Sequence, residues 1–193
     1  RDHKAVEIIT KIKSKESEFN GYLDKRVSYR RPFGISSNYE PLNNGVPCHF
    51  SQKIGLKYVS SEDLEDRMNI INKLKLLIPF APIAGQTDFS KPIRFFNKNN
   101  IILAKPGEVA SETWLVAFSS KNKSKVLNFK SYLETKFFRF MLLQMVISQN
   151  VTRNCYSFVP NLNEYSNTFT DQELIKYFNL SKDHWDLIDR KIL

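Results

Sequence analysis

The longest apolar pattern in the chain runs through residues 131–147 and has the spacing of an amphipathic helix. Leu133, Phe137 and Met141 follow one another at four-residue intervals, and apolar neighbours widen this stripe well beyond one narrow face. We therefore expect a central helix that the rest of the fold nearly encloses. Because Lys136 and other polar residues interrupt the pattern, it falls short of the roughly 18 uninterrupted apolar residues that a membrane span requires.

A polar and basic turn follows this helix at residues 148–154. The turn carries a guanidinium at Arg153, and its asparagines can adopt the left-handed backbone found at helix ends. Residues 156–159 are then expected to form a short strand. The pattern thus predicts an apolar helix that holds a polar tip at a fixed position.

Shorter apolar and alternating runs predict strands. Lysine alternates with apolar residues before Pro79, which predicts a strand that presents Lys73 and Lys75 on one face. Two further β-prone runs flank a turn at Pro106 and Gly107, and we expect them to pair or lie adjacent in one sheet. The expected strands cover residues 54–59, 74–78, 101–104 and 114–118.

Helix signals mark both ends of the chain. Apolar residues share one side of a helix over residues 2–15, and Ser61 can cap a short helix. Residues 170–173 form a Thr-x-x-Glu capping box, so a helix is expected to start at Asp171, with a second start at Ser181. The elements together predict an α+β fold, in which a mixed or antiparallel sheet packs around the central hydrophobic helix and short helices close the chain.

One domain is the expectation for a chain of 193 residues, because that length suffices for a single well-buried core. Residues 1–20 are expected to form a connector helix from an upstream domain, and residues 21–193 to form the domain itself. With 41% hydrophobic residues, the chain can bury enough apolar surface to avoid disorder. It starts at Arg1 without a methionine, so we expect a piece of a longer polypeptide.

Cysteine usage and the absence of sorting signals favour a cytoplasmic protein. Cys48 and Cys155 are too few and too far apart to suggest a disulfide framework, and no Cys/His spacing of a zinc site occurs. No signal peptide, lipidation motif or transmembrane segment is visible, so a membrane partner is not expected.

Twenty-nine Lys and Arg residues against twenty Asp and Glu residues give a formal net charge of +9. A field of that sign attracts polyanions, among which nucleic acid is the first partner to consider. The alternative is that a lysine- and asparagine-rich composition reflects an AT-biased genome. Charge alone does not decide between these interpretations.

Catalytic motifs are missing from the sequence. There is no glycine-rich phosphate loop, His-Glu-x-x-His motif or Gly-x-Ser-x-Gly motif, and His3, His49 and His184 are isolated. The acidic run at residues 62–66 fits the solvated start of a helix. A nuclease would need an acidic pair and a lysine on facing strand positions, which the sequence does not show clearly. We therefore expect no catalytic, cofactor-binding or metal-ligating residue in this chain.

Basic and polar residues give the positive prediction, which is a surface for double-stranded DNA. Arg30 and Arg31 lie in a turn-rich loop suited to phosphates, although a solvated basic loop is the plainer alternative. Further cations would contact phosphates, while Gln, Asn and Arg side chains of residues 149–154 are suited to base edges. The predicted DNA contacts are Arg30, Arg31, Lys73, Lys75, Arg94, Lys98, Lys136, Arg139, Gln149, Asn150, Arg153 and Asn154.

Several short segments occur in an order that is specific in combination. They are ETWLV at 112–116, YLETKFFRF at 132–140, FVP at 158–160 and TDQEL at 170–174, with RRPFGISSNY at 30–39 upstream. Together they resemble the C-terminal target-recognition region of adenine-methylating restriction-modification enzymes. The chain departs from the family pattern at Ala110 and Ser111, where cysteine and threonine often precede the Glu-Thr pair.

The resemblance implies a module that reads duplex DNA for a covalently fused methyltransferase and, in the type IIG arrangement, a fused endonuclease. The Asn-Pro-Pro-Tyr tetrapeptide and the glycine-bearing S-adenosylmethionine motif of the methyltransferase are missing here, so the resemblance implies no catalysis by this chain. S-adenosylmethionine, and Mg²⁺ for a nuclease, are expected only in the parent enzyme. Two other hypotheses stay open: a stand-alone metal-dependent DNA nuclease, and a protein-interaction domain with incidental basic charge.

Overall fold

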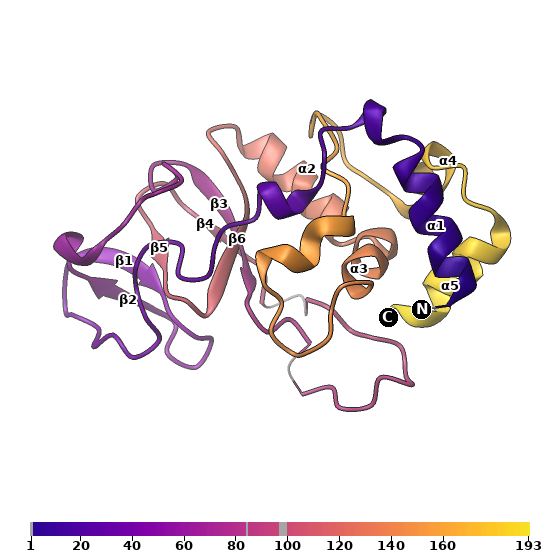
Figure 1. The fold of residues 1–193 in the computed structure, drawn as a ribbon. Coiled ribbons are helices and arrows are strands. Elements are labelled where there is room, and N and C mark those ends of the chain that lie inside the picture. Colours follow the sequence, from indigo (N-terminus) through magenta and orange to yellow (C-terminus); the bar gives the residue numbers. More distant parts are fainter. Residues whose placement is uncertain (1, 84, 97–99) are drawn as a thin grey trace.

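The computed structural model describes residues 2–83, 85–96 and 100–193. In these residues the strands form two three-stranded sheets and the longer helices gather to one side of them, so the fold is α+β as expected (Figure 1). None of the described helices is long and apolar enough to cross a membrane.

One sheet has the order β4-β3-β6, and both outer strands run antiparallel to the central strand. The other sheet has the order β2-β1-β5 and is mixed, because β1 pairs antiparallel with β2 and parallel with β5. The expected strands at residues 101–104 and 114–118 belong to one sheet, but the prediction that they pair or lie adjacent was wrong, because β3 lies between them. The strands are β1 (Val46–His49), β2 (Leu56–Val59), β3 (Leu74–Pro79), β4 (Ile102–Ala104), β5 (Val109–Ala110) and β6 (Trp114–Ser120).

The β4-β3-β6 sheet separates two hydrophobic cores. On β3, Leu76 and Ile78 enter the core beneath the helices, whereas Leu77 enters the core between the two sheets. On β6, Leu115 and Val116 divide between the two cores in the same way. Because side chains alternate along a strand, the molecule has three layers: helices, the β4-β3-β6 sheet and the β2-β1-β5 sheet (Figure 1).

The single helix expected at residues 131–147 is in fact two helices, α2 (Lys123–Leu133) and α3 (Lys136–Leu143). Thr135 separates them, because its backbone is extended and its hydroxyl accepts the N–H of Phe138 at 3.1 Å. A threonine in that geometry is the N-cap of a new helix. The prediction of one continuous helix was therefore wrong.

A carboxylate from the C-terminal region supports this second helix start. Asp171 accepts the N–H groups of Lys136 at 3.1 Å and Phe137 at 2.8 Å. The expectation that the helix is enclosed holds for α3, whose apolar residues lie in the core of the helical layer. Its buried residues are Phe137, Phe138, Phe140, Met141 and Leu142.

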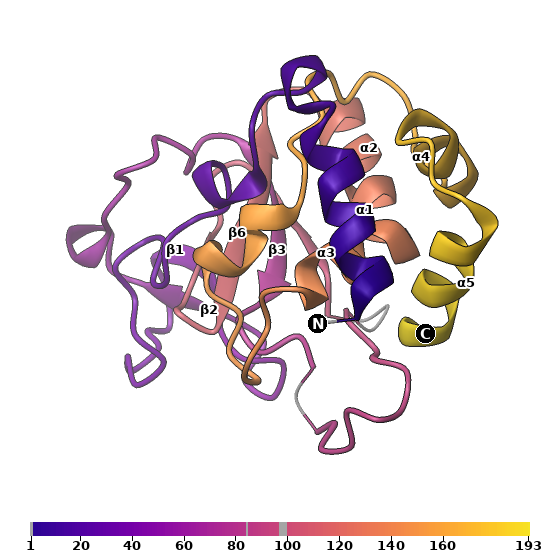
Figure 2. The same cartoon turned by 45° about the vertical axis from the view of Figure 1, so that its right-hand side comes forward.

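Both ends of the chain form helices with the expected starts. α4 (Asp171–Tyr177) begins after the capping box of Thr170, and α5 (Lys182–Lys191) begins after Ser181. The N-terminal helix α1 (His3–Lys13) packs against α5, and its buried side chains join the core of the helical layer (Figure 2).

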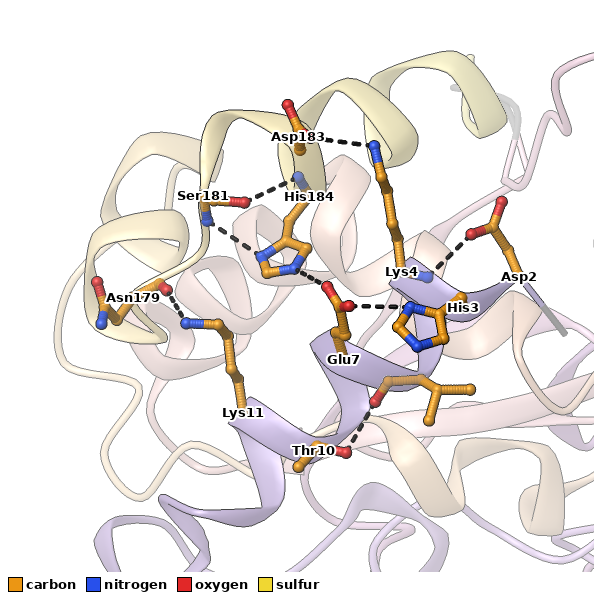
Figure 3. A network of polar contacts seen from close by, with 11 residues as sticks. Asp2, His3, Lys4, Glu7, Thr10, Lys11, Asn179, Ser181, Asp183 and His184 are labelled. Atoms are coloured by element: carbon orange, nitrogen blue, oxygen red, sulfur yellow. Dashed lines mark hydrogen bonds and ion pairs between the residues drawn. The ribbon is translucent and has the colours of Figure 1, made fainter.

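A polar network joins α1 to α5 (Figure 3). The buried ring of His184 accepts the N–H of Ser181 at Nδ1, 3.1 Å away, so its own proton lies on Nε2, 3.0 Å from Glu7 Oε2. Glu7 also contacts His3 at 2.9 Å. The hydrogen bond from His184 is the main cause that holds the pKa of Glu7 below its ordinary value.

The short strand expected at residues 156–159 does not form. Residues 156–158 instead end η4 (Arg153–Phe158), a 3-10 helix that buries the ring of Tyr156, and Val159 follows it directly. Pairing near this segment is limited to an isolated bridge between Tyr22 and Pro160. Local hydrogen bonds of the 3-10 type thus take the place of a sheet ladder.

The helix expected after Ser61 is also much shorter than predicted. Ser60 caps a single 3-10 turn, η3 (Ser61–Asp63). Beyond it, the carboxylate of Asp66 accepts the N–H groups of Ile70 at 2.8 Å and Ile71 at 3.0 Å, which turns the chain toward β3. Two further 3-10 helices are η1 (Glu16–Glu18) and η2 (Leu23–Lys25).

Candidate nucleic-acid interface

The adjoining ends of β3 and β6 form the base of the candidate site. Pro79 of β3 pairs with Trp114 of β6, and the next residue, Phe80, donates its N–H to the carbonyl of Thr113 at 2.9 Å. The carbonyl of Phe80 accepts the N–H of Val151 at 2.8 Å. Phe80 therefore links the sheet to the polar turn that follows α3.

Ser28 fixes the arginine-bearing loop to β6. The N–H of buried Ser28 donates to the carbonyl of Val116 at 2.9 Å, and its hydroxyl accepts the N–H of Val116 at 2.8 Å. Two residues later, the guanidinium of Arg30 lies 4.8 Å from the centre of the Phe80 ring. This contact places the loop beside the end of β3.

A buried carboxylate holds both arginines of this loop. Glu112 is 8% exposed, and its Oε2 lies 3.1 Å from Arg31 Nη2 and 3.4 Å from Arg30 Nε. Its Oε1 accepts the N–H of Ser37 at 3.0 Å and the hydroxyl of Ser37 at 3.1 Å. These bonds, led by the Ser37 N–H, hold the pKa of Glu112 below its ordinary value. The carboxylate is therefore charged at neutral pH.

Arg153 reaches the same place from η4. Its guanidinium lies 4.0 Å from the centre of the Tyr29 ring, within the range of a cation–π contact, and its Nε donates to the carbonyl of Asp24 at 2.8 Å. Tyr29 is 58% exposed, so the contact lies at the surface. Arg153 thus contacts the residue that directly precedes Arg30.

A concavity of about 400 Å³ opens beside these residues, between Tyr29, Arg31, Arg67 and Met68. Arg67 adds a further guanidinium and lies 2.7 Å from Glu65. Three segments far apart in the sequence thus contribute arginines to one region. We call this set, Tyr29, Arg30, Arg31, Arg67 and Arg153, the arginine surface.

Half of the twelve predicted DNA contacts lie at or beside the arginine surface. Arg30, Arg31 and Arg153 belong to it directly. Gln149, Asn150 and Asn154 are exposed within two residues of Val151 or Arg153, which the contacts above tie to Phe80 and Tyr29.

Three other predicted contacts lie around the carboxyl end of the chain. Lys136 forms an ion pair with Asp189 at 2.6 Å, and Arg139 donates to the carbonyl of Leu193 at 3.4 Å. Arg94 is exposed beside Ile93, whose carbonyl accepts the N–H of Leu193. Figure 1 places the carboxyl terminus across the helical layer from β1 and β5. The predicted set therefore does not share one face, and DNA contact by this second group stays a prediction.

The prediction that Lys75 faces outward from its strand was wrong. Lys75 is 0% exposed, because β3 is covered on both faces. Burial lowers the pKa of its ammonium to about 8. Lys73 is partly buried just before β3, and Lys98 lies outside the described residues. The ammonium of Lys75 donates to four carbonyls at 2.7 to 3.3 Å, those of Ile70, Ile71, Lys73 and Lys105.

Sequence reasoning missed the parts of the site that come from other segments. Arg67 follows directly on the acidic run at residues 62–66, which concealed it. Glu112 lies in the ETWLV segment, but no periodicity links it to Arg31, which is 81 residues away. Phe80 had no signal beyond its position after an expected strand.

Within the described ranges, no group of three or more His, Cys, Asp or Glu side chains is arranged to hold a metal ion. In comparisons with known proteins, the chain matches no family model, no curated protein and no solved structure. The chain's own residues and their geometry are the basis for the function proposed below.

Proposed function

We propose that the chain is a DNA-recognition domain that binds double-stranded DNA through the arginine surface. The observation that carries the proposal is one concavity lined by Arg30, Arg31 and Arg67, with Arg153 from a third segment held over the ring of Tyr29, which also lines it. Arginine is suited to this role because its planar donors match both phosphates and base edges. The net charge of +9 supports a polyanionic partner.

We further propose that the domain supplies sequence specificity to an adenine-specific methyltransferase in a type II restriction-modification polypeptide, and that other domains carry the catalysis. The sequence resemblance supports this part of the proposal. S-adenosylmethionine and Mg²⁺ would then bind to those other domains.

Within this proposal, the arginines divide into two roles. Arg67 contacts a phosphate, which positions the duplex without reading its sequence. Its carboxylate partner Glu65 is 50% exposed, so solvent screens that pair, unlike the buried Glu112 beside Arg30 and Arg31. The turn from Gln149 to Asn154 offers amide groups suited to adenine, while Arg153 offers donors suited to guanine. Tyr29 and the Asp24 carbonyl already fix the guanidinium of Arg153, so little side-chain freedom is lost on binding.

Binding is tested by fluorescence anisotropy with short labelled duplexes of randomised sequence, across a series of salt concentrations. Affinity should fall as salt rises, because phosphate contacts release condensed counterions. Arg67→Ala should weaken binding to every duplex and reduce the salt slope by about one unit. Lys182→Ala is the matched control, since it removes one exposed positive charge at the start of α5 and should change neither quantity.

Two outcomes would overturn the proposal. One is that DNA binding does not depend on salt or does not occur, which is the result expected of a protein-interaction domain. The other is an equal loss of affinity in Arg67→Ala and Lys182→Ala, which would mean that charge alone attracts the DNA and that the arginine surface is not its site.

A further inference from the structure

Arg31 has a backbone conformation that its residue type disfavours. Its φ is 59°, in the left-handed region that glycine and asparagine adopt more readily. The N–H of Gly34 closes the turn by donating to the carbonyl of Arg31 at 3.2 Å. A position that suits glycine but holds a long charged side chain is a place where local strain accompanies a functional constraint.

Glu112 fixes the orientation of the Arg31 guanidinium. The carboxylate is anchored twice by Ser37, and the N–H of Glu112 itself donates to the carbonyl of Ile35 at 2.9 Å. Its other oxygen contacts Arg31 Nη2. Because the side chain of Glu112 is 10% exposed while that of Arg31 is 49% exposed, Arg31 is held from within and open on its outer side.

The charge balance favours a neutral ligand group over a phosphate at Arg31. The carboxylate 3.1 Å away offsets much of its positive charge and would repel an approaching phosphate. A base edge carries no net charge and is not repelled in this way. Guanidinium has five N–H donors in a fixed fork, of which one points to Glu112, so a pair of donors remains for the O6 and N7 acceptors of guanine.

We infer that Arg31 reads a guanine in the major groove and that Glu112 is its positioning residue. The recognised sequence then contains a G·C pair at the base that faces Arg31. This inference rests on the proposed function, because it names the base that the arginine surface selects.

The test starts from a selection of preferred duplexes out of a random pool by the wild-type protein. Each guanine of the selected sequence is then replaced singly by 7-deazaguanine, which lacks the N7 acceptor. At one position the replacement should lower wild-type affinity roughly 5- to 10-fold, because it removes one of the two acceptors of a bidentate contact. Arg31→Gly should lose more than this on the natural duplex, and its further loss on the modified duplex should be smaller, because only the O6 contact remains to be lost.

Arg31→Gly suits the test because glycine adopts the same backbone without strain. Relief of the backbone strain opposes the loss of the ion pair with Glu112, so thermal unfolding of the variant is measured in parallel and binding is compared at a temperature where both proteins are folded. Glu112→Gln provides an independent readout: it should lower discrimination at the same guanine and raise affinity for unrelated duplexes, because a negative charge is removed. A residue with a merely structural role would not produce this opposite pair of changes.

The outcomes separate the two proposals. If the wild-type protein selects a sequence but Arg31→Gly still discriminates every guanine, the inference is wrong and the DNA-recognition function stands. If Arg31→Gly loses the same factor on all duplexes, Arg31 is a phosphate contact. If the wild-type protein selects no sequence at all, the proposed function fails and the inference fails with it.

Discussion

The buried ammonium of Lys75 should make the stability of this domain depend on pH. Its pKa is about 8 in the folded protein and about 10.4 in an unfolded chain. Between these two values the unfolded state binds more protons than the folded state, so stability rises with pH. The two pKa values give a gain on the order of 1 kcal/mol between pH 7 and pH 9 from this residue alone.

Lys75→Met removes the titrating group while keeping an unbranched apolar chain of similar length. At pH 7 it should destabilise the fold by about 1 to 3 kcal/mol, since buried carbonyls lose a donor. Three of the four carbonyls keep a backbone N–H partner, from Lys73, Gly107 and Glu108, which limits the loss. The stability of Lys75→Met should lack the increase between pH 7 and pH 9 that the ammonium gives the wild type.

The assay is urea unfolding of the wild type and Lys75→Met at several pH values from about 7 to 9. The quantity of interest is the difference between their free energies of unfolding at each pH. Taking the difference matters because buried Cys48, whose pKa is raised to about 12, gives both proteins an opposing loss of stability above its unfolded pKa. If the difference in free energy of unfolding stays constant from pH 7 to pH 9, the lowered pKa assigned to Lys75 is wrong. DNA affinity should be unchanged in Lys75→Met, because the ammonium is buried.

Three further predictions concern the polar network and the DNA surface. His184→Gln should be less destabilising than His184→Ala in thermal unfolding, because an amide oxygen can still accept the Ser181 N–H; equal losses would show that this bond contributes little. The pKa of Glu7 is lower in the folded protein than in the unfolded chain, where it is about 4.3. The stability that Glu7 contributes should therefore be present above pH 4.3 and be lost as pH falls through the folded pKa. Comparing the free energy of unfolding of the wild type with that of Glu7→Gln across this range measures the effect. Arg153→Ala should reduce discrimination among duplexes by about 1 to 3 kcal/mol in competition binding. A uniform loss would make it a phosphate contact.

The parts of the fold that local chemistry determines could be predicted from the sequence. The capping box at Thr170 and the cap at Ser181 are contacts between near neighbours, and the helices begin where they indicate. The break before α3 could not be predicted in this way, because Asp171 supports that helix start from 34 residues further along the chain. Lys75 was misassigned for a similar reason: alternation does not reveal that a second sheet covers the other face of its strand.

Apart from Arg67, which pairs with nearby Glu65, the arginines of the arginine surface depend on contacts between distant segments. Arg31 is held by Glu112, Arg153 by the Asp24 carbonyl and the Tyr29 ring, and Arg30 lies over Phe80. Ordering a long arginine side chain costs up to about 2 kcal/mol of conformational entropy, and here much of that loss has already occurred on folding. The same contacts that pre-order the surface for a ligand are those that no local pattern in the sequence reveals. The sequence could therefore nominate arginines of this surface, but the partners that orient them emerge only from the packing of the end of β3, the start of β6 and the turn after α3.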